Sequence, residues 1–147
     1  MAEDTESFVK NNEELLTDGK HSADAFKQDN LTYRIIGAAM AVHSALGPGF
    51  YEKVYENALC HELGKRGIRF QQQKRYRVKY DGVDVGEMVV DLVVADRVIV
   101  ELKAAREPAS VTEAQVIGYL KAAGLKRGLV INFNVRSLKS GIKRISA

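Results

Sequence analysis

The sequence has one cysteine and no apolar run that approaches the length of a membrane span. A single cysteine excludes an internal disulfide. Because Cys60 falls within a helical apolar pattern, it is expected to be a reduced thiol in the core. Residues 1–6 are acidic and lack the apolar core of a secretory signal. These absences together predict a cytoplasmic protein that does not contact a membrane.

Acidic residues are scarce after the first 29 positions. Residues 1–29 hold eight Asp or Glu and three Lys or Arg, whereas residues 30–147 hold eleven and nineteen. The expected organisation is therefore an acidic leader, mobile or helical, over 1–29 and one basic domain over 30–147. A basic domain suits a polyanionic partner, and the alternative is a solvated surface with extra lysines.

Hydrophobic periodicity predicts an α/β domain. Two helices are expected first, one from an N-cap at Thr32 to a stop at Gly47-Pro48-Gly49, and one over 50–66. Strands are expected over 70–80, 85–94 and 98–104, then a helix over 111–123 and strands over 128–133 and 142–145. Asp81-Gly82 is typical of a hairpin turn. This order predicts a mixed sheet of four to five strands flanked by helices.

The most informative residues are three charged side chains in two apolar strands. Asp91 lies in the run 89–94, and Glu101 and Lys103 lie in the run 98–103. Burying such charges is costly unless a partner compensates them. Residues that oppose each other in an antiparallel hairpin share a face. Asp91 can therefore join Glu101 only if the connection has an odd length, such as residues 95–97; a two-residue turn would send it to the opposite face.

Two carboxylates at one edge form hard-oxygen ligands for Mg²⁺, which usually keeps several waters. A bound metal lowers the pKa of a coordinated water and stabilises charge on a phosphate. Lys103 could orient or deprotonate that water, or neutralise the developing charge. The alternative is structural: Glu101 and Lys103 form a solvated strand face, and Asp91 caps a bulge.

The spacing of these residues, D-x9-E-x-K, resembles the PD-(D/E)xK nuclease superfamily. Residues 49–55 read G-x-x-E-x-x-Y, and residues 115–119 read Q-x-x-x-Y. The combination is similar to the small GxxExxY family within that superfamily, over about residues 31–146. The resemblance implies a restriction-endonuclease-like core, and it leaves catalytic activity open because one fold can host active and inactive members.

The resemblance also implies roles for four further residues. Glu52, in the first turn of its helix, is expected as a third metal ligand beside Asp91 and Glu101; alone, it would read as a glutamate at the positive helix end. Gln115 and Tyr119 share a helix face and are expected to contact substrate or lysine; the alternative is a hydrogen-bonded pair at a helix–sheet seam. His43 is either a metal ligand, as in RecB-type nucleases, or a packed histidine.

The predicted function is a metal-dependent nuclease with Mg²⁺ or Mn²⁺ as cofactor. The expected partner is nucleic acid, in the first instance DNA, and a homodimer would supply two sites for a double-strand cut. Basic residues on the first strand and after the third helix could follow a nucleic-acid backbone or simply aid solubility. The alternative functions are an inactive nucleic-acid-binding or assembly module and, less favoured because an adaptor needs no carboxylate–lysine grouping, a protein–protein adaptor.

Overall fold

The computed structural model describes residues 20–104 and 109–147. The chain forms the elements in the predicted order: α2 (Lys20–Leu46), α3 (Glu52–Lys65), β1 (Phe70–Tyr80), β2 (Val83–Val94), β3 (Val98–Lys103), α4 (Ala109–Ala123), β4 (Arg127–Asn132), the short 3-10 helix η1 (Leu138–Gly141) and β5 (Ile142–Ser146). None of the described helices has the length and apolar character that a bilayer crossing requires. The residues 1–19 of the acidic leader lie outside the described part.

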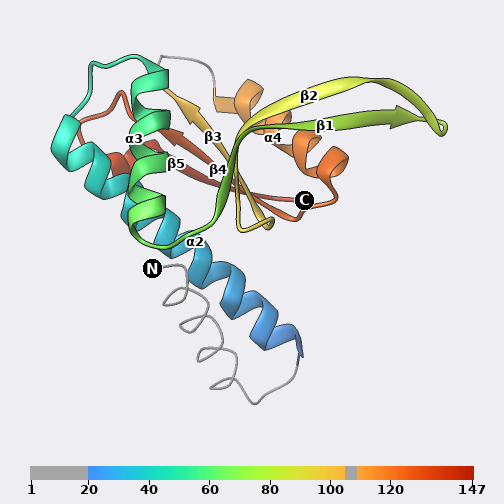
Figure 1. Ribbon diagram of the computed structural model, residues 1–147, viewed down its shortest axis with the longest axis horizontal. Helices are drawn as coiled ribbons and strands as arrows, with labels where there is room; N and C mark the ends of the chain where they lie inside the picture. The colour runs from blue at the N-terminus through green and yellow to red at the C-terminus, as the bar shows by residue number, and fades with distance from the viewer. Residues whose placement is uncertain (1–19, 105–108) are drawn as a thin grey trace.

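The five strands form one mixed sheet in the order β1-β2-β3-β4-β5. β3 and β4 are parallel, with α4 as the crossover between them, and the other neighbours are antiparallel. One apolar cluster joins α2 and α3 to one face of the sheet, and a second joins α4 to the other face. Figure 1 shows these layers. The predicted α/β class and the mixed sheet flanked by helices are confirmed.

Helix α2 is longer than predicted. It begins at Lys20, so Thr32 lies in its interior and is only 7% exposed. The prediction that Thr32 caps the helix is therefore wrong, because the backbone is already helical for twelve residues before it and has no free N-terminal turn there for a hydroxyl to cap. The helix also crosses position 29, where the leader was expected to end.

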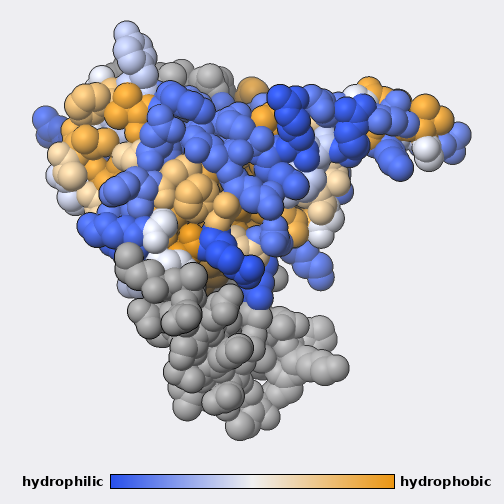
Figure 2. Space-filling view, in the orientation of Figure 1, coloured by the Kyte–Doolittle hydropathy of each residue, from blue (hydrophilic) through white to orange (hydrophobic). Residues whose placement is uncertain are grey.

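Strands β1 and β2 form a long hairpin that extends beyond the rest of the molecule (Figures 1 and 2). Its turn is the predicted Asp81-Gly82 pair, and both residues have positive φ, 53° and 75°, as a two-residue hairpin turn of type I′ requires. The tip carries exposed apolar residues, including Tyr80 at 75% and Val83 at 61%. The outer half of this hairpin therefore forms an arm rather than part of the core.

At one point along the hairpin, the side chains of β1 and β2 exchange the two faces of the sheet. Residues two apart on a strand normally share a face, yet Leu92 packs with α2 and α3 whereas Val90 packs with α4. The β1–β2 register includes Gln72↔Leu92 and Lys74↔Val90, so Gln73 and Asp91 lie between these pairs without being ladder partners. Gln73 has φ 53°. The two strands thus exchange their faces at Gln73 and Asp91.

Candidate active site

The connection between β2 and β3 has the odd length that the site requires. Ala95, Asp96 and Arg97 join the strands, and the N–H of Arg97 donates to the carbonyl of Val94 at 3.0 Å. Ala95 and Asp96 both have positive φ. The register is Leu92↔Val100, Val93↔Ile99 and Val94↔Val98. One further step in this register places Asp91 opposite Glu101, which confirms the predicted parity.

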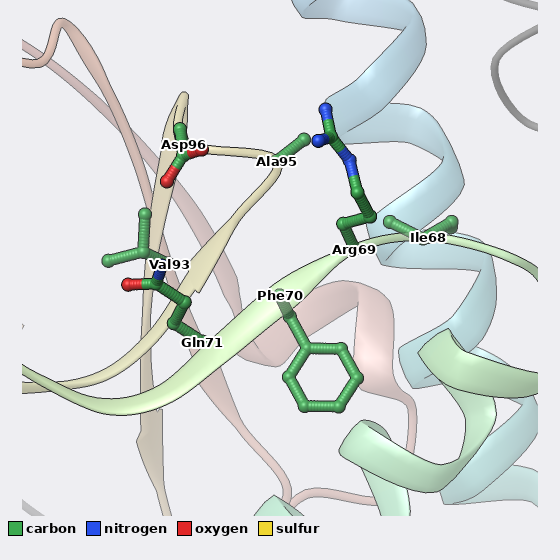
Figure 3. A pocket seen from close by; sticks show the side chains of 7 residues that line it. All are labelled: Ile68, Arg69, Phe70, Gln71, Val93, Ala95 and Asp96. Atoms are coloured by element: carbon green, nitrogen blue, oxygen red, sulfur yellow. The ribbon is translucent and has the colours of Figure 1, made fainter. Parts of the chain in front are cut away.

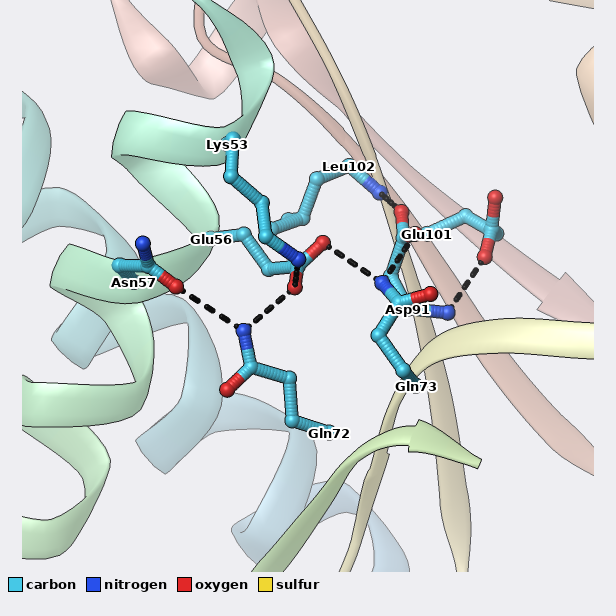
Figure 4. Close-up of polar contacts among 8 residues, drawn as sticks. All are labelled: Lys53, Glu56, Asn57, Gln72, Gln73, Asp91, Glu101 and Leu102. Atoms are coloured by element: carbon cyan, nitrogen blue, oxygen red, sulfur yellow. Dashed lines mark hydrogen bonds and ion pairs between the residues drawn. The ribbon is translucent and has the colours of Figure 1, made fainter. Parts of the chain in front are cut away.

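At Asp91 and Glu101, hydrogen bonds from backbone N–H groups to the two carboxylates take the place of the backbone–backbone bonds of the β2–β3 ladder. The N–H of Asp91 donates to Glu101 Oε1 at 2.9 Å, and the N–H of Leu102 donates to Asp91 Oδ2 at 2.9 Å. Each acidic side chain therefore reaches the backbone of the other strand (Figure 4). These reciprocal bonds hold the two side chains together at the point where β2 separates from β3.

The surroundings of this acidic pair disfavour its negative charges. Glu101 is 5% exposed, and burial, with the charge of Asp91 as the second cause, raises its pKa to about 8. Burial also raises the pKa of Asp91, although the hydrogen bond from Leu102 opposes this. Two adjacent carboxyl groups in such a position would be stabilised by a nearby cation.

Lys103 supplies one positive charge beside the pair. It is the last residue of β3 and is half-buried. Its charge lowers the pKa of both Asp91 and Glu101, which places its ammonium group within electrostatic reach of them. Because Lys103 lies two residues after Glu101 on one strand, the two share a face, as the sequence predicted.

Glu52 approaches the pair from α3, of which it is the first residue. Its charge contributes to the raised pKa of Glu101. The loop before it is held by Tyr55, which is fully buried and stacks on Phe133 with ring centroids 4.5 Å apart. The Tyr55 hydroxyl donates to the carbonyl of Gly47 at 2.5 Å and accepts from the N–H of Phe50 at 3.2 Å. The tyrosine of the G-x-x-E-x-x-Y segment thus fixes where the helix bearing Glu52 begins.

Gln115 and Tyr119 contact each other on α4, on the other side of the sheet from α3. Their side chains are hydrogen-bonded, and Tyr119 is 9% exposed. Burial, followed by the charges of Glu101 and Asp91, raises the pKa of Tyr119 to about 12. The phenol therefore lies near the acidic pair and keeps its proton at neutral pH. The pair is thus hydrogen-bonded at the seam between α4 and the sheet, and its contact with a substrate stays a prediction.

His43 has other contacts. Its Nε2–H donates to the carbonyl of Val135 at 2.8 Å, and its ring lies 6.3 Å from that of Phe133. It is 8% exposed and borders a hollow with Arg136 and Lys139. Among the described contacts none joins His43 to Asp91 or Glu101, so its surroundings are those of a packed, hydrogen-bonded histidine.

The sequence interpretation missed a polar network between α3 and β1. Glu56 is 3% exposed and accepts hydrogen bonds from Lys53 at 2.8 Å, Gln72 at 2.5 Å and Gln73 at 3.0 Å. Burial alone would raise the pKa of Glu56, but these three donors outweigh it and hold the pKa below its ordinary value. The available signals were the run of three glutamines at 71–73 and the position of Glu56 one helical turn after Glu52.

The carboxylate oxygens of the site suit a hard divalent cation that keeps most of its waters, and they do not form a complete coordination shell by themselves. Within the described part of the chain, no three His, Cys, Asp or Glu side chains lie close enough together to hold a metal ion. Asp91 and Glu101 nevertheless present carboxylate oxygens at one place, where added positive charge is favourable. Mg²⁺ commonly binds one or two carboxylates and keeps several waters. The acidic pair fits that mode of binding.

Another hollow, of about 400 Å³, lies at the start of β1 and beside the β2–β3 turn. Its charged lining residues are Arg69 and Asp96 (Figure 3). Arg69 and the neighbouring Phe70 point in opposite directions there. It presents one carboxyl group and one guanidinium, so it lacks the paired carboxylates needed for metal-assisted hydrolysis.

Comparison with known proteins agrees with this geometry. Residues 29–145 match the family model described as the PD-(D/E)XK nuclease superfamily, which spans all the site residues named above. No curated protein and no solved structure gives a significant match. Nucleases of this superfamily generally use divalent metal ions and act on nucleic acid. The chain belongs to the PD-(D/E)XK nuclease superfamily.

Proposed function

We propose that this protein is a metal-dependent nuclease that hydrolyses phosphodiester bonds in nucleic acid. The observation that carries the proposal is the reciprocal bonding of Asp91 and Glu101 across β2 and β3, with Lys103 beside them. A purely structural pair of carboxylates would be expected in solvent or against a permanent cationic partner. Here the charges of both carboxyl groups remain unfavourable, which suits a site that takes up a divalent cation.

Asp91 and Glu101 would hold Mg²⁺ or Mn²⁺, with Glu52 adding negative charge from α3, and the bound cation would acidify a water and neutralise phosphate charge. Lys103 positions the attacking water or neutralises charge that develops on the phosphate. The Tyr119 O–H donates a hydrogen bond to a phosphate oxygen, since the raised pKa of the phenol keeps its proton in place. Gln115, hydrogen-bonded to Tyr119, presents its amide on the same face.

A groove between β1 and α4 offers a surface for the rest of the substrate. It has a volume of about 660 Å³, and its lining includes Arg77, Lys79 and Lys121. Arg77 is paired with Asp84 at 2.7 Å and with Glu87 at 3.0 Å, so part of its charge is already used. The groove still combines basic groups from two elements, which suits the backbone of a nucleic acid. DNA is the first substrate to test, and a homodimer would allow a double-strand cut.

We also propose a family within the superfamily and a location in the cell. Membership of the GxxExxY family rests on the segment 49–55 and is supported by the contacts of Tyr55 with Gly47 and Phe50. A cytoplasmic location is supported by Cys60, a free and buried thiol whose pKa burial raises to about 11. A nuclease of this kind would act where nucleic acid is available.

The decisive experiment replaces Lys103 with alanine. Purified wild-type protein is incubated with single- and double-stranded DNA and RNA in Mg²⁺, Mn²⁺ or EDTA. We expect metal-dependent cleavage that Lys103→Ala reduces by at least about 100-fold, because one charge-stabilising group in such a site is typically worth that much. Lys139→Ala, at an exposed lysine of η1, serves as the control and should cleave normally.

The outcomes separate the nuclease from an inactive binding module. Cleavage by Lys103→Ala at the wild-type rate would reject the proposed role of the lysine. If the wild-type protein binds nucleic acid equally with and without metal and cleaves no form of it, the binding module is the better description. Circular dichroism of both variants verifies that any loss of cleavage is not a loss of folding.

A further inference from the structure

Gln73 occupies an unfavourable backbone conformation in the middle of β1. Its φ is 53°, in the left-handed region that glycine adopts readily and other residues adopt at a cost. The conformation coincides with the point where β1 and β2 exchange their faces. Glycine would allow the same exchange of faces without strain, and what glutamine adds to it is the set of contacts that its side chain makes.

The amide of Gln73 joins two carboxylates on different elements. Its Nε2 donates to Glu56 Oε1 at 3.0 Å and to Asp91 Oδ1 at 3.3 Å (Figure 4). A glutamine amide has two N–H groups, so each carboxylate can receive one of them. Gln73 is therefore a direct polar link between helix α3 and the acidic pair.

Both ends of this link are held firmly. On α3, Glu56 also accepts from Lys53 and Gln72, so the loss of either of these two bonds still leaves it with two donors. On β2, the N–H of Leu102 binds Asp91 Oδ2 while Gln73 binds Oδ1, so both oxygens of Asp91 have a donor. Two donors on two oxygens fix the plane of the carboxyl group. Without Gln73, Oδ1 would lose the donor described for it, and the Leu102 bond would hold Oδ2.

The same helix carries Glu52, one turn before Glu56. A link from Glu56 to Asp91 thus fixes the acidic pair relative to the helix from which a third carboxylate approaches. Groups that orient a metal ligand in this way commonly affect metal affinity as strongly as some ligands do. The contacts of Gln73 with Glu56 and Asp91 therefore explain its strained backbone, which the pairing of β1 and the packing of the core do not.

We infer that Gln73 is a positioning residue, which holds Asp91 and helix α3 in the relative arrangement that binds the divalent cation. This role rests on the proposed function, because it concerns the cation site of the nuclease. A side chain of this length with two N–H groups reaches both carboxylates, which offsets the cost of the φ of 53°.

Three variants test the role. Gln73→Gly removes the amide and relieves the backbone strain. Gln73→Asn keeps an amide and tolerates positive φ, but its side chain is too short to reach both Glu56 and Asp91. Gln72→Ala is the matched control: Gln72 is the adjacent residue, is also exposed, and donates to Glu56 and Asn57 but not to Asp91. Binding of Mn²⁺ alone is measured by isothermal titration calorimetry, with the melting temperature beside it.

We expect both Gln73 variants to bind Mn²⁺ about tenfold more weakly than the wild-type protein. The melting temperature of Gln73→Gly should be unchanged or higher, since a strained residue has become glycine. Gln72→Ala should bind Mn²⁺ within about twofold of wild type. If Gln73 had only a structural role, Gln73→Gly would not lose metal affinity while its melting temperature stayed the same or rose.

The inference is overturned if Gln73→Gly and Gln73→Asn bind Mn²⁺ as tightly as wild type, if Gln72→Ala weakens binding equally, or if the wild-type chain does not bind Mn²⁺. Its failure is distinguishable from failure of the proposed function. Cleavage by the wild-type protein with indifferent Gln73 variants removes only the positioning role. Mn²⁺ binding that depends on Gln73, in a chain that cleaves no nucleic acid, removes only the nuclease activity.

Discussion

Glu101 is a carboxyl group at a position that would otherwise suit an apolar residue. Its neighbours Val100 and Leu102 are fully buried, and Glu101 itself is 5% exposed. Burial and the charge of Asp91 raise its pKa from 4.5 to about 8. At neutral pH and without a cation, this residue therefore works against the stability of the fold. That cost is expected at a site that is complete only when a cation is bound.

This pKa leads to a prediction for the metal-free protein. Between pH 4.5 and 8 the folded chain holds a proton on Glu101 that the unfolded chain has lost, so stability should fall as pH rises through this range. Glu101→Gln should abolish most of that fall, because the amide has no charge to bury. At pH 9 the variant should be more stable by on the order of 3 kcal/mol.

The measurement is urea unfolding in EDTA at pH 5, 7 and 9. Gln retains an oxygen that can accept from the N–H of Asp91, so the hydrogen bond is not the variable. Glu87→Gln, on the hairpin outside the core, is the control and should keep the wild-type dependence. Parallel pH profiles of wild type and Glu101→Gln would show that Glu101 titrates normally.

Helix α4 provides two different surfaces. Its buried face, with Tyr119, packs on the sheet beside the acidic pair, whereas Gly118, Lys121 and Ala122 line the groove beside β1. A Cβ added at Gly118 would meet no atom within 4 Å. Glycine inside a helix costs about 1 kcal/mol relative to alanine. No neighbouring atom requires this glycine, so the position can take a side chain without a clash.

Substitutions at Gly118 should therefore separate stability from nucleic-acid binding. Gly118→Ala should stabilise the protein by up to about 1 kcal/mol and leave binding unchanged. Gly118→Glu should fold equally well but bind a labelled oligonucleotide about tenfold more weakly at low salt, because it adds a negative charge beside Lys121. The difference should shrink as salt is raised.

Fluorescence anisotropy in EDTA measures this binding without cleavage. Both variants have a side chain at position 118, so the comparison isolates charge and size from helix propensity. Equal affinities of Gly118→Ala and Gly118→Glu at low salt would show that nucleic acid does not lie in the groove.

In the whole molecule, the site depends on both layers of helices. Of the residues proposed for it, Glu52 lies on α3 at one face of the sheet, and Gln115 and Tyr119 lie on α4 at the other. The acidic pair lies where β2 turns over between these faces. A ligand that binds there contacts the folded arrangement and has little affinity for the unfolded chain.

Metal binding should consequently raise the melting temperature. Mn²⁺ at about 100 times its dissociation constant stabilises a folded protein by about 2.7 kcal/mol, which corresponds to about 5–10 °C for a chain of this size. The double variant Asp91→Asn/Glu101→Gln should lose this shift, and EDTA should reverse it in the wild type. Differential scanning calorimetry tests it. An equal shift in the double variant would place the bound cation elsewhere.

The sequence was sufficient for much of this site. The apolar runs around Asp91 and Glu101 identified two neighbouring strands, and the site hypothesis predicted the odd connection between them that the register of the structure confirms. Gln115 and Tyr119 followed from helical spacing and the family resemblance. These features depend on local periodicity and on turn length, which a sequence displays directly.

Other features could not be predicted in this way. Thr32 has the chemistry of a helix cap, yet the helix continues through it from Lys20. Gln73 lies in the strand predicted over 70–80, and the alternation of a regular strand would place it on one face with Gln71 and Arg75. The turnover of the hairpin breaks that alternation and directs its amide toward Glu56 and Asp91, 17 and 18 residues away in the chain.

The sequence by itself determined the order of elements and the presence of a lysine two residues after Glu101, and it reduced the meeting of Asp91 with Glu101 to the length of one connection. Only the tertiary structure decided how α3 is coupled to that pair and where β1 and β2 exchange faces. The physical reason is that propensity and spacing act over a few residues, whereas the Glu56–Gln73–Asp91 link depends on helix packing and on one strained φ.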